Sequence, residues 1–506
     1  MNRVIVALPV DGRPAVRSQV QALVACAGWQ LRMPEVAALG HFRVPADRDA
    51  LAQWLLEAGD AADAFVLSLD MLVYGGLVPS RFIPDTLAAL RQRLVLVETL
   101  KARWPGKPVF AFAATLRISN NHVADEEKPY WAQHGAQLWA WSYLGDHAAV
   151  TGDAASAALA QEAAASIPAA IRDDYFATRQ RNFEVTRRAL RLVQRGAIDR
   201  LVLPQDDTAQ WGLNIAERRA LQAEAAALGL QSRVAIYPGA DEVMHTLCAR
   251  VVSQLEGWAP LRVALAPSDP TRIGELRALY EDRPVLESVA SQVQAVGAVL
   301  TADEATADVL LALHSQGTAQ GDHAMQRALP TAAHHALHNA QTISSSWCAR
   351  LREWQASGRP LLLADLAYAN GGDPELLALL GTNAHPGLLP LPQAYAGWNT
   401  ASNSLGSLLA TAVLAQGRWH EAPARQALAL RLLEDGLYQG QLRQALRDSV
   451  DESRATPADL LGAARAAVIA PANAWAAALG LGFAVADVSL PWGRTFEIDL
   501  QLAPTQ

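Results

Sequence analysis

Two pairs of adjacent carboxylates are the residues of this sequence best suited to chemistry. Asp241 and Glu242 follow a Pro-Gly turn after the apolar residues 233–237, and Asp206 and Asp207 follow the preceding apolar run. Adjacent acids can divide acid–base work, one orienting a group while the other donates a proton. The alternative is that Asp241 only caps a helix and Glu242 is only a first-turn acid. The second pair, at an equivalent strand end, favours chemistry.

Other polar and aromatic side chains follow the remaining apolar runs. Such groups can bind a hydroxylated substrate through hydrogen bonds and ring faces. The predicted substrate-binding residues are Asp11, Arg13, Asp70, Tyr74, Arg81, Arg117, Asp206, Asp207, Asp365, Tyr395, Trp398 and Asn399. The arginines could instead neutralise buried carboxylates, the aromatic rings could pack under loops, and Asn399 could cap a helix.

A metal site is the main alternative use of these residues. Oxygen and imidazole ligands could come from Asp11, Asp70, Asp206, Asp207, Asp365, His122, His245 and His314. The sequence has no His-x-His pattern, and its one His-x-x-x-His pair, His334 and His338, lies in a predicted helix away from the strand ends. His245 lies one helical turn beyond Asp241, so these two side chains could simply pair. We therefore predict no metal and no cofactor.

The positions of these side chains depend on strands that alternate with helical patterns. Apolar runs begin at residues 64, 108, 200, 233, 261, 308, 360 and 393, and such continuous runs indicate parallel strands covered on both faces. The predicted class is α/β, with a (β/α)8 TIM-like barrel preceded by a βα element at Val4. The alternative is an open doubly wound parallel sheet. Both architectures place polar site residues at the carboxyl ends of strands.

Two domains are predicted. Residues 1–403 would form the catalytic barrel, and residues 404–506 a mainly helical region with a terminal β-hairpin. The segment 124–167 interrupts the barrel pattern and is predicted to be a lid over Asp241 and Glu242, with Trp131 or Trp141 touching the substrate. Its alternative is a helical hairpin on the outer wall.

Composition restricts the functional classes. In 506 residues, 51% are hydrophobic, which is enough for a large core, and the net charge of −8 argues against a nucleic-acid partner. Three widely separated cysteines predict neither a disulfide framework nor a cysteine zinc site. No apolar run reaches about 18 residues and the first one is short, so we expect no membrane span, no secretory leader and a cytoplasmic location. The oligomeric state stays open.

Two resemblances add to these inferences. Over nearly the whole chain the sequence resembles a bacterial family known as domain of unknown function 4127, which implies a shared fold but no activity. That resemblance rests on the segments 8–14, 68–77, 204–207, 239–243 and 395–399, with Ser80 and Arg81. The residues 239–243 are also similar to the Gly-Gly-Asp-Glu pattern of family 20 β-N-acetylhexosaminidases, with Ala240 at the second glycine, and to the Asp-Glu pair of family 123 β-N-acetylgalactosaminidases.

The glycosidase resemblance implies a substrate and a mechanism. In both families the Asp-Glu pair follows the fourth strand of a barrel, and counted from residue 64 it does so here. The expected protein is a glycoside hydrolase acting on 2-acetamido sugars by a substrate-assisted retaining mechanism, with Asp241 orienting the acetamido group and Glu242 protonating the leaving oxygen. The alternatives are a metal-dependent hydrolase or isomerase, or a non-catalytic sugar- or anion-binding protein.

Overall fold

The computed structural model describes residues 3–325, 343–381 and 387–505, so His334 and His338 lie outside the described residues. Its contacts divide the chain into two compact units. The first unit contains Met1–Gly12, Gly28–Val251 and Tyr280–Asp282, and the second contains Arg13–Ala27, Val252–Leu279 and Arg283–Gln506. This division differs from the predicted boundary after residue 403, which lies inside the second unit.

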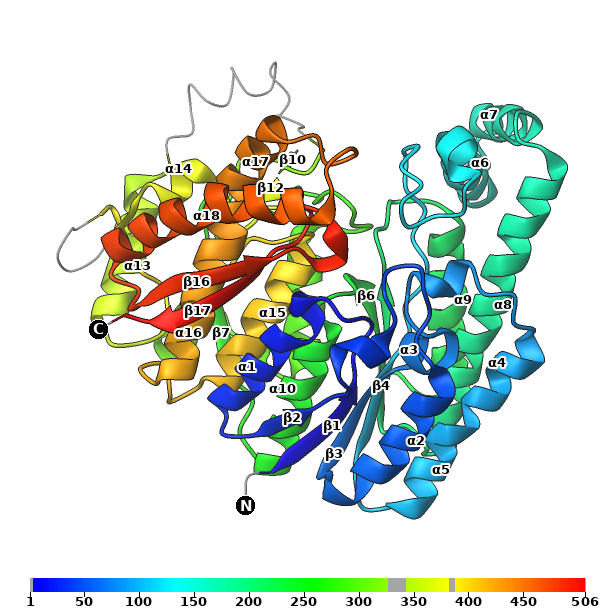
Figure 1. The fold of residues 1–506 in the computed structure, drawn as a ribbon, viewed down its shortest axis with the longest axis horizontal. Helices are drawn as coiled ribbons and strands as arrows, with labels where there is room; N and C mark the ends of the chain where they lie inside the picture. Colours follow the sequence, from blue (N-terminus) through cyan, green and yellow to red (C-terminus); the bar gives the residue numbers. More distant parts are fainter. Residues whose placement is uncertain (1–2, 326–342, 382–386, 506) are drawn as a thin grey trace. The chain divides into compact units, whose positions relative to one another are not determined.

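The first unit is built on a parallel sheet of six strands in the order β2-β1-β3-β4-β5-β6 (Figure 1). The strands are β1 (Val4–Leu8), β2 (Gln30–Arg32), β3 (Ala64–Ser68), β4 (Val109–Phe112), β5 (Arg200–Gln205) and β6 (Val234–Pro238). The chain order reverses between β1 and β3, because β2 lies on one side of β1 and all later strands lie on the other. All carboxyl ends meet at one edge of the sheet, where the polar residues follow.

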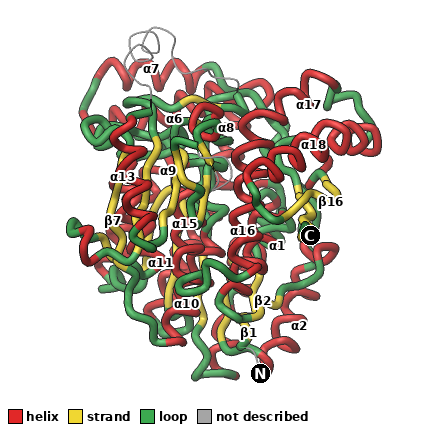
Figure 2. Tube along the Cα trace, turned by 90° about the vertical axis from the view of Figure 1, so that its left-hand side faces the viewer, coloured by secondary structure: helices red, strands yellow, loops and turns green. Residues whose placement is uncertain are grey.

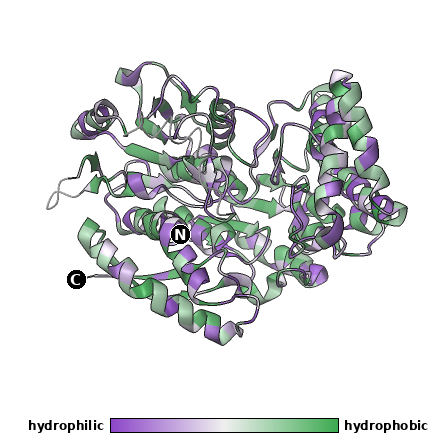
Figure 3. Ribbon diagram, turned by 90° about the horizontal axis from the view of Figure 1, so that it is seen from above, coloured by the Kyte–Doolittle hydropathy of each residue, from purple (hydrophilic) through white to green (hydrophobic). Residues whose placement is uncertain are grey.

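One face of this sheet forms the main core of the first unit. Alternate strand residues such as Phe65 and Leu67 pack against residues such as Leu55, Leu90 and Leu190 from the covering helices. The elements between the strands are η2 (Val36–Leu39), α2 (Arg48–Ala58), η3 (Gly59–Ala61), α3 (Leu69–Tyr74), η4 (Pro79–Arg81), α4 (Leu87–Arg93), α5 (Val95–Arg103), α8 (Ala169–Gln194) and α9 (Leu213–Ala227). Figure 3 shows the strands mostly in the hydrophobic colour and the helices in both colours. This is expected of buried strands and of helices with one face toward the core.

The predicted insertion 124–167 forms two antiparallel helices, α6 (Trp131–Thr151) and α7 (Ala154–Ala165), that contact each other along their length (Figure 1). Trp131 is only 1% exposed and packs in a small cluster with Leu138 and Tyr175. The cavity beside it measures about 20 Å³, room for about one water molecule. The Trp131 ring is therefore not open to a sugar in this conformation, because it packs in this cluster. Trp141 is half-buried, and the lid over Asp241 and Glu242 stays a prediction.

The second unit contains a parallel sheet of five strands in the order β15-β11-β9-β7-β8. These strands are β7 (Arg262–Pro267), β8 (Val299–Leu300), β9 (Val309–His314), β11 (Leu361–Asp365) and β15 (Ala394–Ala396). The order again reverses after the first strand, here between β7 and β9, so the five strands have the same order as the first five of the other unit.

Helices lie on both faces of the second sheet, and Figure 2 shows α11, α13 and α15 next to its strands. Trp347 and Leu351 of α13 pack on Leu310 and Leu363, and α15 contacts β11 and β15. The longer elements are η1 (Pro14–Val16), α1 (Ser18–Cys26), α10 (Val243–Glu256, which begins in the first unit), α11 (Val285–Val296), η5 (Glu304–Thr306), α13 (Ser345–Ala356), α14 (Pro374–Leu377), α15 (Ala401–Leu414), α16 (Ala422–Arg431), the π-helix η6 (Leu432–Leu442), α17 (Arg443–Ser449), α18 (Pro457–Leu479) and η7 (Pro491–Gly493). Short paired strands are β10 (Gly321–Asp322) with β12 (Tyr368–Ala369), and β13 (Leu380–Gly381) with β14 (Leu389–Pro390).

The predicted α/β class with parallel strands is confirmed, and all eight strands expected from residue 64 onward are present. A single closed barrel is not confirmed. Four of those strands, β3 to β6, lie in the first sheet, and the other four, β7, β9, β11 and β15, lie in the second. The six-stranded and the five-stranded sheets are both open. The predicted alternative was also an open parallel sheet, but a single one.

The chain ends in the predicted antiparallel hairpin, β16 (Phe483–Ser489) with β17 (Asp499–Pro504). Within the described part of the chain, α18 is the one helix whose length and apolar composition would allow a membrane crossing. Ala464, Val468 and Ala472 of this helix pack into the core of the second unit, as residues of a core helix in a globular protein do. Length and composition by themselves do not place it in a membrane.

Candidate functional site

Five acids lie after neighbouring strands at the carboxyl edge of the first sheet, and we call them the carboxylate cluster. Asp70 begins α3 after β3, Asp206 and Asp207 follow β5, and Asp241 and Glu242 follow β6. The pairing of β5 with β6 extends to Gln205 opposite Pro238, so the two predicted carboxylate pairs leave adjacent strands at nearly the same level. The structure therefore brings both pairs to one place.

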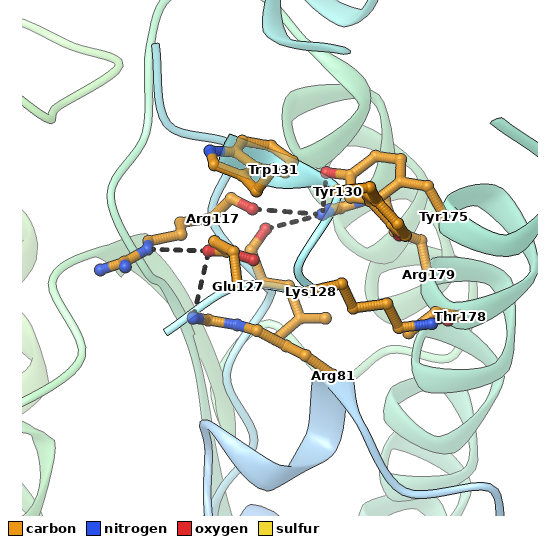
Figure 4. Close-up of a pocket in the computed structure, with 10 residues that line it drawn as sticks. Arg81, Arg117, Glu127, Lys128, Tyr130, Trp131, Tyr175, Thr178 and Arg179 are labelled. Atoms are coloured by element: carbon orange, nitrogen blue, oxygen red, sulfur yellow. Dashed lines mark hydrogen bonds and ion pairs between the residues drawn. The ribbon is translucent and has the colours of Figure 1, made fainter. Parts of the chain in front are cut away.

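Two arginines connect the cluster to acids of the insertion, and Figure 4 shows both of them beside Glu127. Arg81 donates to the carboxylate of Asp206 at 3.0 Å and pairs with Glu127 at 3.1 Å. Arg117 also pairs with Glu127, at 3.2 Å, and donates to Asp207 at 3.4 Å. The guanidinium donors are directed at protein carboxylates, so this conformation matches the alternative in which these arginines neutralise buried acids.

Burial raises the pKa of two of the clustered acids. Burial, and then the charge of Asp206, raises the pKa of Asp207 to about 7 against the opposing charge of Arg117, and Asp241 adds to the rise. Burial also raises the pKa of Asp70 to about 7, although the Ala114 N–H donates to its carboxylate at 2.9 Å. Asp207 also has a positive φ of 31°, a strained backbone conformation that occurs more often at functional sites. Acids that still hold a proton near pH 7 beside other carboxylates can act as proton donors.

Glu242 lies folded back over the end of β6. The Glu242 carboxylate oxygens lie 2.8 and 2.9 Å from the point where a side chain on Gly239 would begin, and Gly239 has φ of +100°. Only glycine tolerates both the conformation and the contact. Glu242 is 1% exposed and Asp241 is 8% exposed. The Pro238-Gly239 turn that the sequence predicts therefore leaves space for the Glu242 carboxylate.

Stability should depend on pH through Asp70. In the unfolded chain aspartate ionises near pH 4, whereas the pKa of Asp70 in the folded protein is about 7. Between these values the folded protein binds more protons, so the free energy of unfolding should fall as pH rises from about 4 to about 7. Asp70→Asn keeps an acceptor for Ala114 N–H and cannot ionise. We expect it to stabilise the protein by about 1–3 kcal/mol at pH 8 and to have little effect at pH 4 in urea unfolding; an equal effect at both pH values would contradict this cause.

The remaining predicted residues are divided between the units. In the first unit, Asp11 follows β1 and Tyr74 ends α3, and both are buried. Burial raises the pKa of Tyr74 well above its usual value. In the second unit, Arg13 pairs with Glu497 at 3.1 Å, and Asn399 has a left-handed backbone with φ of 58°. Trp398 is 3% exposed, so its ring offers no open face to a sugar in this conformation.

A second polar network surrounds Asp365 at the carboxyl edge of the second sheet. The Tyr395 hydroxyl donates to Asp365 at 3.0 Å, and the Asp373 N–H donates to the same carboxylate oxygen at 2.7 Å. His314, the last residue of β9, pairs through Nε2 with Asp373 at 2.8 Å, and both side chains are 1% exposed. Gln316 adds a donor to Asp373 at 2.6 Å. The ring of Tyr395 is buried and its hydroxyl is engaged, so its predicted direct contact with a substrate is not available here.

The candidate metal ligands form no metal-binding group in the part of the chain that the structure describes. Among the residues that the structure describes, no three His, Cys, Asp or Glu side chains form a group suited to a metal ion. His245 lies in α10 and is buried, whereas His122 is exposed in the loop before α6.

A family comparison accounts for nearly the whole chain. A family profile described as "Protein of unknown function (DUF4127)" matches residues 5–501. The chain belongs to this family. No curated protein and no solved structure gave a match. The sequence resemblance to this family is thereby confirmed, and the resemblance to glycosidases remains limited to the short segment around Asp241 and Glu242.

The match to the DUF4127 family spans both units and therefore both polar networks. Sequence reasoning about this family member missed several residues that complete them. Glu126 and Glu127 lie in the insertion, and only a run of three acids, Asp125 to Glu127, marks them. Asp373 stands before Pro374, a common helix start, and its side chain indeed caps α14 by accepting from the Glu375 N–H at 2.9 Å. That cap was readable from the sequence, but its pairing with His314 was not.

Proposed function

We propose that the carboxylate cluster of the first unit is the active site of a glycoside hydrolase acting on 2-acetamido sugars. The observation that carries the proposal is the meeting of two carboxylate pairs at one sheet edge, where the pKa values of Asp207 and Asp70 are raised to about 7. Glycoside hydrolysis needs an acid that protonates the leaving oxygen next to a group that stays ionised. The proposal rests on this cluster and not on the fold, because the pair follows the last strand of an open sheet.

Each member of the second pair has a role. Asp241 would accept a hydrogen bond from the acetamido N–H of the substrate and polarise the acetamido group. The carbonyl oxygen of the acetamido group would then attack the anomeric carbon as the glycosidic C–O bond breaks. Glu242 would give its proton to the departing oxygen. A water molecule would then attack the same carbon, lose its proton to the Glu242 carboxylate and reopen the cyclic intermediate. Two displacements give retention of configuration. A carbohydrate partner and a cytoplasmic location belong to this proposal.

The proposal predicts dependence on the acetamido group. We expect the purified full chain to release nitrophenol from a 4-nitrophenyl 2-acetamido-2-deoxy-β-hexoside and to be much slower on the matched hexoside with a 2-hydroxyl group, because the hydroxyl cannot act as the internal nucleophile. Asp241→Asn should lower kcat on the acetamido substrate. Equal rates on both substrates would exclude the substrate-assisted mechanism, and no turnover on glucosaminide or galactosaminide would count against the proposed substrate class.

A further inference from the structure

A cavity of about 260 Å³ lies in the second unit at the carboxyl ends of β7 and β9. A volume of this measure holds a small organic molecule, since about 10–15 Å³ suffices for one water. The strand order of the sheet reverses at β7, which has β8 on one side and β9 on the other, and the cavity lies at the end of β7 beside β9. In open parallel sheets the crevice at this reversal is where ligands bind. Its polar lining includes Ser268, Thr271, Arg272, His314, Ser315 and Ser344.

The lining is rich in hydrogen-bond donors. Ser344 caps α13, a helix of 12 residues, so the first N–H groups of that helix start at the cavity wall. A helix start carries unpaired N–H groups and a partial positive charge that attract anions. Arg272 is half-buried, and among the described residues its guanidinium has no carboxylate partner. A bound anion would supply that partner.

Two buried polar atoms of the lining also have no partner in the described structure. Ser315 is 4% exposed and its Oγ forms no hydrogen bond. His314 is 1% exposed, and its Nδ1 forms none, although its Nε2 is held by Asp373. Burying a polar group without a partner costs free energy, so a water molecule or a ligand in the cavity is expected to bind these atoms. These atoms point to a ligand independently of the helix start.

The charge balance of the cavity favours an anion. Asp269 also lines it, but its Oδ1 already accepts from the Thr271 hydroxyl at 2.7 Å and from the N–H groups of Thr271 and Arg272, both at 3.2 Å. Burial lowers the pKa of His314, yet the hydrogen bond from its ring to Asp373 and the neighbouring acids outweigh burial and raise it overall. The protonated ring makes both nitrogens donors.

We propose that this cavity binds a phosphate group, either as the free ion or as the ester of a small sugar. A tetrahedral oxyanion can accept at once from Arg272, Ser315 and the start of α13, which a planar neutral ligand cannot. The site lies outside the carboxylate cluster and does not depend on the glycosidase proposal.

Calorimetric titration of the full chain tests the proposal. The probes are inorganic phosphate, glucose 6-phosphate and glucose, at fixed ionic strength. Phosphate or its ester should bind and glucose should not. Arg272→Gln and Ser315→Ala should each weaken binding by about 10- to 100-fold, the loss expected for one charged or buried hydrogen bond. Arg425→Gln, an exposed arginine of the same unit, is the matched control and should bind as the parent does.

The three probes also separate the two sources of the group. Tighter binding of glucose 6-phosphate than of inorganic phosphate would identify an ester, and the reverse would identify the free ion. The proposal is overturned if neither phosphate probe binds, if Arg272→Gln and Ser315→Ala bind like the parent, or if Arg425→Gln loses as much affinity as they do. Thermal unfolding of each variant confirms that the comparison is made between folded proteins.

Discussion

Glu242→Gln is expected to lower kcat by about 10²–10⁴-fold on 2-acetamido glycosides with poor leaving groups, the loss typical of a missing general acid. Glutamine has the same shape as glutamate, so it fits in the place that the Glu242 side chain occupies above Gly239. The fold should therefore persist. The loss should be much smaller on 4-nitrophenyl glycosides, because nitrophenolate leaves without protonation. This dependence on the leaving group distinguishes loss of an acid from a general disturbance of the site.

Two further variants complete that experiment. Glu57→Gln, an exposed acid of α2 in the same unit, is the matched control and should keep full activity. Asp207→Asn tests the other carboxylate pair, since the pKa of Asp207, raised by burial to about 7, also suits a proton donor. Near-full activity of Glu242→Gln together with a leaving-group-dependent loss in Asp207→Asn would move the acid to the pair after β5. Unchanged activity in both variants would exclude Glu242 and Asp207 as the acid.

Asp373→Ala is expected to lower the free energy of unfolding by about 3–5 kcal/mol, the usual result of removing one partner from a buried ion pair. Asp373 and His314 meet at 2.8 Å with 1% exposure each. Their pKa shifts agree with an ion pair, because their contact raises that of His314 and lowers that of Asp373 despite burial. The substitution also removes the acceptor of Gln316 and the cap of α14.

Urea unfolding at pH 6 measures this effect. The comparison is Asp487→Ala, which breaks the exposed pair of Asp487 with Arg465, where the side chains are 39% and 47% exposed. Exposed pairs contribute about 0–1 kcal/mol because water screens them. A loss of stability no larger in Asp373→Ala than in Asp487→Ala would show that the His314–Asp373 pair is not a major support of the second unit.

The strands were predictable because each depends on local pattern. The runs that begin near residues 64, 200 and 309 are continuous, apolar and followed by polar residues, which suits a buried parallel strand of any open sheet or barrel. Whether the strands close into one barrel or divide between two sheets was not predictable, because hydrophobic period and composition do not say which strands become neighbours. The two units share a strand order, yet no internal repeat is visible in the sequence. A strand order requires apolar residues in the strands but does not require the same residues in both units.

The site divides in the same way. The Asp-Asp and Asp-Glu pairs could be recognised, and a parallel sheet was enough to bring Asp207 and Asp241 to one edge. The partners of the arginines could not be foreseen, because Arg81 and Asp206 are 125 residues apart and Glu127 comes from an insertion. The insertion gives carboxylates to Arg81 and Arg117, which was not expected, and its Trp131 ring is packed in a cluster with Leu138 and Tyr175.

The sequence by itself determined the α/β class, the strands, the terminal hairpin and the acids at the strand ends, since these follow from local periodicity, turn residues and caps. Only the tertiary structure decided that the strands form two open sheets, that burial raises the pKa of Asp70 and Asp207 to about 7, and that His314 meets Asp373. Desolvation and ion pairing depend on neighbours that are distant along the chain. Asp373, for example, lies 59 positions after His314. A residue's type limits what chemistry it can do, and its packed surroundings decide which charge it carries.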